Sequence, residues 1–165
     1  MLLIACGCDT TGKTTLVNAL AERLDYDVVK GSSFEITGGK NQEELFEAFM
    51  ELTALENTIL DRYIYSNEVY SPLYNDYSCL NDEQRRFIER EVQGATLIIY
   101  LSAPVEVIKE RFRTRGEDYV DEDKIETILH NYEESLNKSN LTILRYDTSQ
   151  STTEEIVESI IEYIN

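Results

Sequence analysis

Short apolar runs alternate along the chain with segments in which apolar residues recur every three or four positions. The runs have the length of strands, and they predict strands at 2–6, 27–30, 58–60, 96–101 and 141–146. The first run is continuously apolar, which is typical of a strand buried on both faces, and the fourth run is the clearest strand in the chain. Strands of this kind joined by helical segments indicate a parallel sheet with helical crossovers.

Helical periodicity fills the intervals between these runs. It predicts helices at 13–24, 45–55, 82–92, 104–114, 121–137 and 152–164. The last of them opens with a capping box of Thr152 and Glu155. Residues 31–40 are polar and rich in glycine and serine, so we expect a loop there. The pattern predicts one domain over residues 1–165, an α/β three-layer sandwich with a five-stranded parallel sheet flanked by helices.

The composition is that of one soluble globular domain, because 42% of the 165 residues are apolar and 28% are charged. No apolar run approaches the ~20 residues of a membrane span. The first run lacks a basic leader and is interpreted as a strand, so we expect a cytoplasmic protein without a membrane partner. Cys6, Cys8 and Cys79 lack the spacing of a metal site and are interpreted as reduced thiols.

The charge balance narrows the choice of partners. The chain has 32 acidic and 15 basic residues, which gives a net charge of −17. Such a surface repels phosphate backbones, so we expect no DNA or RNA partner. Small anionic ligands can bind only where the few basic residues gather, and the positions of those residues therefore indicate the function.

A phosphate-binding motif follows the first strand directly. Residues 7–14 read Gly-Cys-Asp-Thr-Thr-Gly-Lys-Thr and fit G-x-x-x-x-G-K-[ST] at every defined position. The backbone N–H groups of such a loop surround phosphates, and the next helix adds the positive end of its dipole. Lys13 is expected to bridge the β- and γ-phosphates, and Thr14 to bind Mg²⁺. The predicted ATP site consists of Gly7, Cys8, Asp9, Thr10, Thr11, Gly12, Lys13, Thr14 and Thr15.

Asp61 and Arg62 follow the third strand. In a parallel sheet this position lies at the same edge as the phosphate-binding loop. Asp61 is expected to hold Mg²⁺ through water, and Arg62 to stabilise the transferred phosphoryl group. The sequence has no guanine-reading motif, and one small domain with such a loop favours a small-molecule kinase.

Three segments in chain order share the pattern of one enzyme family. The loop carries Asp9 and Thr15 as in G-x-D-x-x-G-K-[ST]-T, and residues 61–70 follow D-R-Y-x-x-S-x-x-A-Y with Val69 in place of alanine. Residues 98–118 read as a strand and an arginine-rich segment. In these features the chain resembles the thymidylate kinases, a family of P-loop nucleoside monophosphate kinases, over residues 2 to about 136.

The resemblance implies ATP- and Mg²⁺-dependent phosphorylation of a deoxynucleoside monophosphate, with dTMP or a related pyrimidine nucleotide as the acceptor. It implies that Asp9 contacts the 3′-hydroxyl of the acceptor and that Tyr70 fills the place of a ribose 2′-hydroxyl. It implies that Asn67 hydrogen-bonds the pyrimidine edge. It also implies a homodimer.

The resemblance further implies a lid at about 113–123, with one arginine over the phosphates and another against the adenine. We expect Arg113 and Arg115 to be catalytic and Arg111 to bind ATP. Arg111 and Arg115 are one helical turn apart and share a face. Guanidinium groups that enter a closed site neutralise developing charge.

Several positions depart from the family pattern. Lys30 stands at a position where arginine is common, and it is expected to anchor the acceptor phosphate. Phe46 or Phe49 is expected to supply an aromatic ring for the acceptor base. Because of these departures the acceptor base remains open, and a viral or phage enzyme for an unusual pyrimidine fits the pattern.

Two other hypotheses remain open. A deoxynucleoside kinase of related architecture would phosphorylate a 5′-hydroxyl and would need a carboxylate base near it, for which Glu35 is the candidate. A nucleotide-gated binding module would hold ATP without transferring phosphate. The intact Lys13, Thr14, Asp61 and Arg62 argue against the binding module.

Overall fold

Five parallel strands form one sheet in the order β2-β3-β1-β4-β5. The computed structural model describes residues 1–37, 41–74, 78–116 and 121–165. The strands are β1 (Leu2–Gly7), β2 (Asp27–Lys30), β3 (Thr58–Asp61), β4 (Thr96–Ser102) and β5 (Thr142–Asp147). The predicted five-stranded parallel sheet and three-layer sandwich are therefore confirmed.

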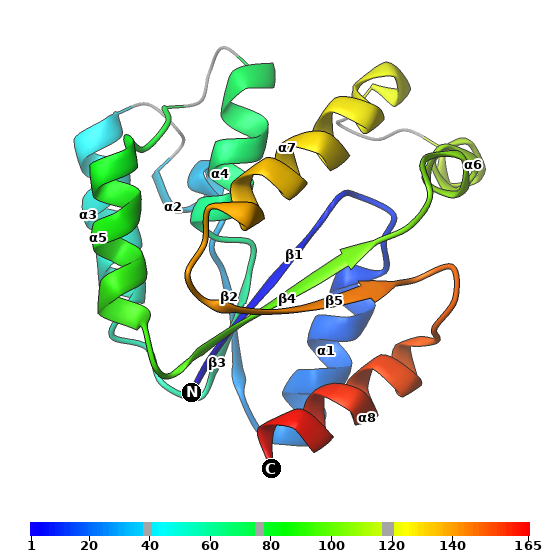
Figure 1. Ribbon diagram of the computed structural model, residues 1–165, viewed down its shortest axis with the longest axis horizontal. Coiled ribbons are helices and arrows are strands. Elements are labelled where there is room, and N and C mark those ends of the chain that lie inside the picture. The colour runs from blue at the N-terminus through cyan, green and yellow to red at the C-terminus, as the bar shows by residue number, and fades with distance from the viewer. Residues whose placement is uncertain (38–40, 75–77, 117–120) are drawn as a thin grey trace.

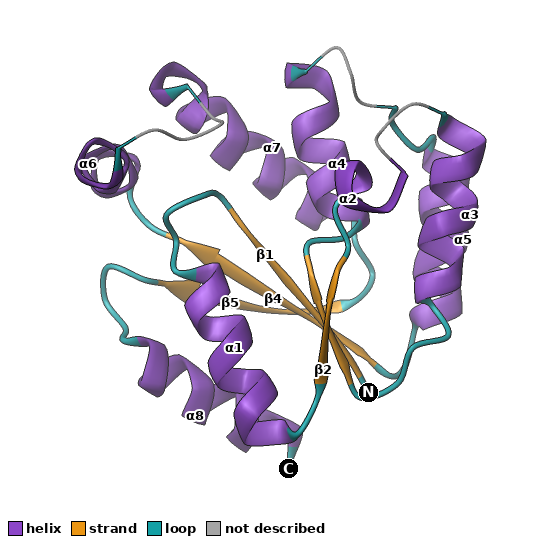
Figure 2. Ribbon diagram, turned by 180° about the vertical axis from the view of Figure 1, so that it is seen from behind, coloured by secondary structure: helices purple, strands orange, loops and turns teal. Residues whose placement is uncertain are grey.

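Helices connect the strands and cover both faces of the sheet. They are α1 (Lys13–Leu24), α2 (Ser33–Thr37), α3 (Gln42–Leu52), α4 (Ile64–Tyr70), α5 (Asp82–Val92), α6 (Val105–Arg115), α7 (Ile125–Asn137) and α8 (Thr153–Ile164). Figures 1 and 2 show α1 and α8 side by side on one face, and α3, α4, α5 and α7 on the other. None of the helices in the described part of the chain is long and apolar enough to cross a membrane.

Side chains of β1 point alternately into the hydrophobic cores on the two faces of the sheet. Ile4 and Cys6 belong to the hydrophobic cluster under α3, α4, α5 and α7, while Leu3 and Ala5 belong to the cluster under α1 and α8. All four are completely buried, because successive side chains of a strand point to opposite faces. The continuous apolar run therefore reflects a central strand between two cores. Burial also raises the pKa of Cys6 to about 12, so this thiol stays protonated.

Several predicted boundaries differ from the structure. The helix predicted at 45–55 is α3, which begins and ends three residues earlier. The segment predicted as a loop at 31–40 contains the short helix α2 at 33–37, and residues 38–40 lie outside the described residues. The helix predicted to start at residue 121 begins as a 3₁₀ turn (Glu122–Lys124), and α7 starts at Ile125. Short 3₁₀ turns are common at helix ends. Of the predicted lid at 113–123, residues 117–120 lie outside the described residues.

Candidate functional site

The loop between β1 and α1 is shaped by two glycines. A Cβ atom at Gly7 would lie 2.6 Å from the carbonyl oxygen of Leu101, so only glycine fits there. Gly12 has φ 80° and caps α1 in a left-handed conformation that other residues seldom adopt. The Thr11 hydroxyl donates a hydrogen bond of 2.7 Å to the carbonyl of Cys8 and closes the loop. The predicted phosphate-binding motif thus has the local structure that its residues dictate.

A cavity of about 240 Å³ opens above this loop. The amino end of α1 borders it, with Thr14 and Thr15 exposed at the first turn. Because the N–H groups at a helix start are free and carry partial positive charge, this cavity favours an anion. One of its lining residues, Arg115, belongs to the predicted lid. The complete lining is Cys8, Asp9, Thr10, Gly12, Lys13, Thr14, Thr15 and Arg115.

Asp61 lies at the carboxyl end of β3 and bonds to two lysines. The ammonium group of Lys13 hydrogen-bonds one carboxylate oxygen, and that of Lys30 hydrogen-bonds the other. The register of β2 and β3 pairs Lys30 with Asp61 directly, which explains the second contact. Asp61 is 3% exposed, and burial alone would raise its pKa. The two positive charges outweigh burial and hold the pKa of Asp61 below its ordinary value.

Arg62 is held in an uncommon backbone conformation. Its φ is 72°, and its N–H donates a hydrogen bond of 3.0 Å to the carbonyl of Ala5 in β1. A Cβ atom at Gly31 would lie 2.4 Å from the carbonyl oxygen of Arg62, so glycine is required where β2 ends. The guanidinium group pairs with Asp9 at 2.8 Å and lies 4.9 Å from the ring centre of Tyr70. The structure therefore brings Asp9, Arg62 and Tyr70 together beside the loop.

The three predicted lid arginines lie in different surroundings. Arg111 donates hydrogen bonds to the carbonyl of Thr10 (3.3 Å) and to the hydroxyl and carbonyl of Thr148 (2.8 and 2.9 Å). It borders a second cavity of about 320 Å³ between the loop and the start of α8. Arg115 lines the cavity above the loop. The guanidinium group of Arg113 instead pairs with Glu122 and is largely exposed.

Other predicted acceptor residues have structural partners. The Asn67 amide donates to the carbonyl of Ser78 (2.7 Å) and accepts from the N–H of Leu80 (3.3 Å), so it holds the segment after α4. Phe49 is fully buried, with its ring 5.1 Å from that of Tyr63. Both side chains therefore make contacts within the protein: Asn67 through its amide and Phe49 through its ring. Phe46, on the same helix, is half-buried with its ring 6.0 Å from that of Phe87 on α5.

Sequence analysis did not identify Tyr132 of α7 as part of this region. Its buried hydroxyl donates a hydrogen bond to the carbonyl of Gly7 (3.2 Å) and lies 3.0 Å from the hydroxyl of Ser66 in α4. Because the Tyr132 proton points to Gly7, Ser66 is the donor in the second bond. The residue joins the loop to α4 and α7. No sequence signal identifies it, since a backbone carbonyl has no residue-type preference.

The described residues contain no group of three or more His, Cys, Asp and Glu side chains placed to hold a metal ion. The side chains predicted for Mg²⁺ are the Thr14 hydroxyl at the exposed start of α1 and the Asp61 carboxylate. Mg²⁺ in phosphotransfer sites takes one or two protein oxygens and completes its shell with phosphates and water. A hydroxyl and a carboxylate therefore suit Mg²⁺ that arrives with a nucleotide.

Comparison with known proteins gives matches over most of the chain. A profile of the deoxynucleoside kinase family matches residues 33–165. YorR, an uncharacterized protein derived from the SPbeta prophage of Bacillus subtilis, is 40% identical over 160 residues, which cover 97% of this chain and 96% of YorR. A putative adenylate kinase of Pyrococcus abyssi is 28% identical over 174 residues, which cover 99% of this chain and 84% of that protein.

Two solved structures share the fold. The crystal structure of YorR from Bacillus subtilis in complex with phosphorylated GDP has a TM-score of 0.93 at 39% identity and covers 99% of this chain and 95% of YorR. The deoxyadenosine kinase of M. mycoides with bound dATP has a TM-score of 0.63 at 21% identity, with full coverage of both chains. At that identity the second structure shows the likeness of fold alone.

Proposed function

The chain belongs to the deoxynucleoside kinase family. From the bonding of Asp61 we propose that it transfers the γ-phosphoryl group of ATP to a deoxynucleoside monophosphate and forms the diphosphate. The family and its nucleotide-binding relatives establish a phosphotransferase that acts in nucleotide phosphorylation. What we propose beyond this is the identity of the acceptor, the use of Mg²⁺ and the roles of the individual site residues.

On the donor side, the cavity above the loop receives the ATP phosphates. Lys13 and the N–H groups at the start of α1 neutralise their charge, and Arg115 reaches the same cavity. Thr14 and Asp61 would hold Mg²⁺, which supplies further positive charge where the phosphates meet. The complex of YorR with phosphorylated GDP supports a phosphorylated nucleotide as the ligand of this fold. Arg111 borders the second cavity, which suits the donor base.

The bonding of Asp61 is the observation that carries the choice of acceptor. A nucleoside acceptor must lose the proton of its 5′-hydroxyl, which requires a carboxylate able to accept it. Asp61 bonds to Lys13 and Lys30 and has a lowered pKa, so it is a poor base. A monophosphate acceptor is already an anion and needs a cation instead. Lys30, at the end of β2, supplies that cation.

The cluster of Asp9, Arg62 and Tyr70 suits the rest of the acceptor. Arg62 would bind the acceptor phosphate and stabilise the transferred group. Asp9 would accept a hydrogen bond from the 3′-hydroxyl, and the buried ring of Tyr70 would leave no room for a 2′-hydroxyl. Transfer then depends on positioning and on electrostatic stabilisation, without a strong base. We propose dTMP as the first acceptor to test and a homodimer as the assembly.

A second candidate function is phosphorylation of a deoxynucleoside at its 5′-hydroxyl. The match of the family profile over residues 33–165 favours it. Its base would be Glu35, which lies on α2 close to the end of β2. The Glu35 carboxylate is exposed and accepts a hydrogen bond of 2.6 Å from the Ser32 hydroxyl. Glu35 would have to leave Ser32 to act as the base.

An ADP-release assay with ATP and Mg²⁺ separates these functions. The acceptors are dTMP, dUMP, dCMP, dAMP and dGMP, with thymidine, deoxycytidine and deoxyadenosine beside them. We expect turnover with a monophosphate and its loss in Lys13→Ala. Lys30→Gln should raise the acceptor KM by about tenfold and leave the KM for ATP unchanged, as expected for the loss of one charged hydrogen bond.

The matched control for the lysine is Lys138→Gln. Lys138 is a surface lysine that pairs with Glu68 on α4, so the variant removes the same charge away from the loop. Turnover with a nucleoside and none with a monophosphate would refute the proposed acceptor and make Glu35→Gln the next variant. ATP binding without turnover of any acceptor would refute the enzyme and leave a binding module.

A further inference from the structure

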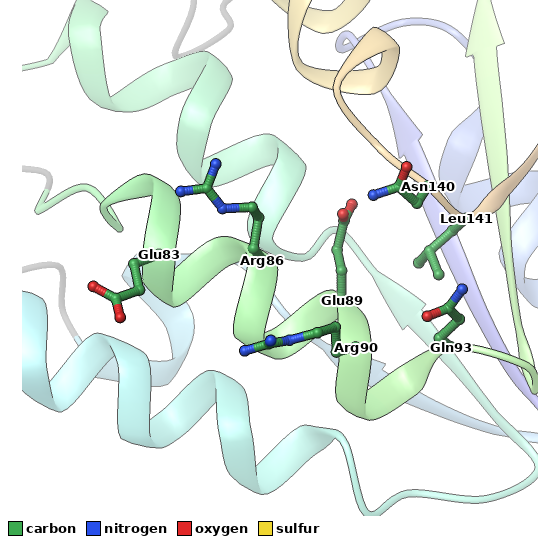
Figure 3. A pocket seen from close by; sticks show the side chains of 7 residues that line it. All are labelled: Glu83, Arg86, Glu89, Arg90, Gln93, Asn140 and Leu141. Atoms are coloured by element: carbon green, nitrogen blue, oxygen red, sulfur yellow. The ribbon is translucent and has the colours of Figure 1, made fainter.

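A separate cavity of about 280 Å³ lies at the edge of the sheet opposite to the phosphate-binding loop. Its lining comes from α5 and from the turn before β5 (Figure 3). Gln93 and Leu141 border it, and they lie just before β4 and β5, at the amino ends of these strands. The loop follows the carboxyl end of β1, so the two cavities are distinct.

Glu89 of α5 brings a buried carboxylate to this cavity, and Arg85, one turn away on the same helix, lies 3.5 Å from its Oε1. The residue is 3% exposed, and its Oε1 accepts a hydrogen bond of 2.8 Å from the Tyr65 hydroxyl. Within the described residues its Oε2 is buried and has no hydrogen-bond partner. Figure 3 shows the carboxyl group pointing into the space between Arg86 and Asn140. A buried carboxylate oxygen is costly without a donor, so this atom suits an N–H or O–H group of a ligand.

Arg86 and Arg90 place two positive charges at the same cavity. They are four residues apart on α5 and therefore share a face. Both are exposed, and neither has a carboxylate within ion-pair distance among the described residues. Arg23 and Arg145 elsewhere on the surface are each paired with a glutamate. The lining also contains Glu83 and Glu89, so the cavity holds charges of both signs, and the Arg90 guanidinium lies 5.5 Å from the ring centre of Phe87. The two guanidinium groups remain without a carboxylate partner among the described residues.

These groups define a ligand with two chemical ends. Two guanidinium groups recognise a phosphate through forked hydrogen bonds, and Glu89 accepts from a base N–H or a sugar O–H. The volume is at the low end for small-molecule sites, which suits a single nucleotide unit rather than a larger partner. We propose that this cavity binds a nucleoside monophosphate, with its phosphate on Arg86 and Arg90 and its donor group on Glu89 Oε2.

Contacts connect this cavity to the acceptor side of the proposed active site. Glu89 bonds to Tyr65 of α4, and the neighbouring Arg85 pairs with Glu68 of α4 at 3.0 Å. The same helix begins two residues after Arg62 and ends at Tyr70. A ligand bound to Glu89 would therefore act through Tyr65 on α4, the helix that carries Tyr70 of the proposed acceptor site. This coupling rests on the proposed function, and we expect occupancy of the cavity to change the acceptor KM.

Equilibrium dialysis with radiolabelled deoxynucleoside monophosphates, without ATP, tests the site. Wild-type protein should bind two nucleotides per chain, one at the acceptor site and one at this cavity. The double variant Arg86→Gln/Arg90→Gln should bind the second nucleotide at least tenfold more weakly. Glu89→Gln, which keeps the shape of the side chain, should also weaken it. The control Arg23→Gln/Arg145→Gln removes the same charge elsewhere and should still bind two.

Several outcomes would overturn the inference. One nucleotide per wild-type chain, or two in the Arg86→Gln/Arg90→Gln variant with unchanged affinity, would show that the cavity binds none. Displacement of the second nucleotide by an equal concentration of inorganic phosphate or ribose 5-phosphate would show a general phosphate site instead.

The two proposals can fail separately. Binding of two nucleotides without any turnover refutes the proposed function and keeps the second site. Turnover with one bound nucleotide refutes the second site alone. Tyr65→Phe tests the coupling, because it should keep the second nucleotide and abolish its effect on the acceptor KM. A retained effect in this variant would refute the connection through Tyr65.

Discussion

Among single residues, Asp61 has the most closely defined surroundings, because its buried carboxylate meets Lys13 from the loop and Lys30 from β2. Removal of Asp61 would leave the buried Lys13 without its carboxylate partner, whereas Lys30 is half exposed and water can solvate it. This bonding, with the lowered pKa of Asp61, makes the carboxylate a poor proton acceptor, and the proposed monophosphate acceptor depends on this property.

The pKa of Asp61 predicts how stability changes with pH. The folded protein holds this pKa below its unfolded value, so the ion pairs stabilise the fold above the unfolded pKa. We expect Asp61→Asn to lower the free energy of unfolding by about 3 kcal/mol at pH 7. The difference from wild type should shrink only as the pH falls below about 4 and through the folded pKa.

Urea denaturation at a series of pH values measures this difference. Asp27→Asn is the control, because Asp27 is exposed at the start of β2. It should show a small difference at every pH. A difference for Asp61→Asn that vanished already at pH 6 would contradict the lowered pKa.

Tyr132 leads to a second prediction for a single residue. Tyr132→Phe removes the hydroxyl that bonds the carbonyl of Gly7 and frees the loop from α7. We expect kcat to fall about tenfold, because small displacements of reacting groups slow transfer strongly. The free energy of unfolding should fall by about 2 kcal/mol, because the variant loses the bond to Gly7 and the bond from Ser66.

The control is Tyr63→Phe, whose hydroxyl donates to the carbonyl of Phe49 at 2.7 Å, inside the core. It should lower the free energy of unfolding by about 1 kcal/mol, for its one hydrogen bond, and leave kcat unchanged. Equal losses of kcat in both variants would mean that Tyr132 acts only through stability. Steady-state kinetics and denaturation on the same preparations decide this.

Residue types predicted part of the site and missed the rest for a physical reason. The positions of the loop, Asp61 and Arg62 at strand ends could be predicted, because each lies in a short motif directly after an apolar run. Asn67 had a predicted role with the acceptor base, but the fold occupies both ends of its amide. Tyr132 and Thr148 could not be predicted, since their contacts join distant parts of the chain through backbone carbonyls.

At the scale of elements, the sequence pattern was most informative for strands whose two faces are both buried. The strands at the centre of the sheet are buried on both faces, so their apolar runs predict them directly. The helix α2 has five residues in a polar segment and shows no periodicity that could predict it. The start of α7 was predicted four residues too early, because the acidic turn before it also has a helical composition.

The cap of α8 yields a prediction at this scale. The Thr152 hydroxyl accepts from the N–H of Glu155 at 3.3 Å, and the Glu155 carboxylate accepts from the N–H of Thr152 at 2.8 Å. Thr152→Ala should lower the free energy of unfolding by about 1 kcal/mol. Thr127→Ala, at an exposed position within α7, should leave it nearly unchanged. Urea denaturation checks both, and equal effects would contradict a role for the cap.

At the scale of the whole molecule, the net charge of −17 opposes anionic ligands. Raising the ionic strength from 0.01 to 0.15 M shortens the Debye length from ~30 to ~8 Å and screens this repulsion. We expect nucleotide association to become several-fold faster over this range. Stopped-flow mixing with a fluorescent nucleotide measures the rate. A rate that falls with added salt would show that the positive charges of the cavity dominate the approach.

The contact between Gly31 and the carbonyl of Arg62 has a consequence for how this chain can diverge. Any side chain at position 31 collides with a backbone atom rather than with a flexible group. A substitution of Gly31 is therefore compatible with the fold only after the backbone at residue 62 has moved. That path is itself held by the bond to Ala5. The two positions should therefore change together among descendants of this sequence. A library that varies acceptor preference would keep both constant and vary their neighbours.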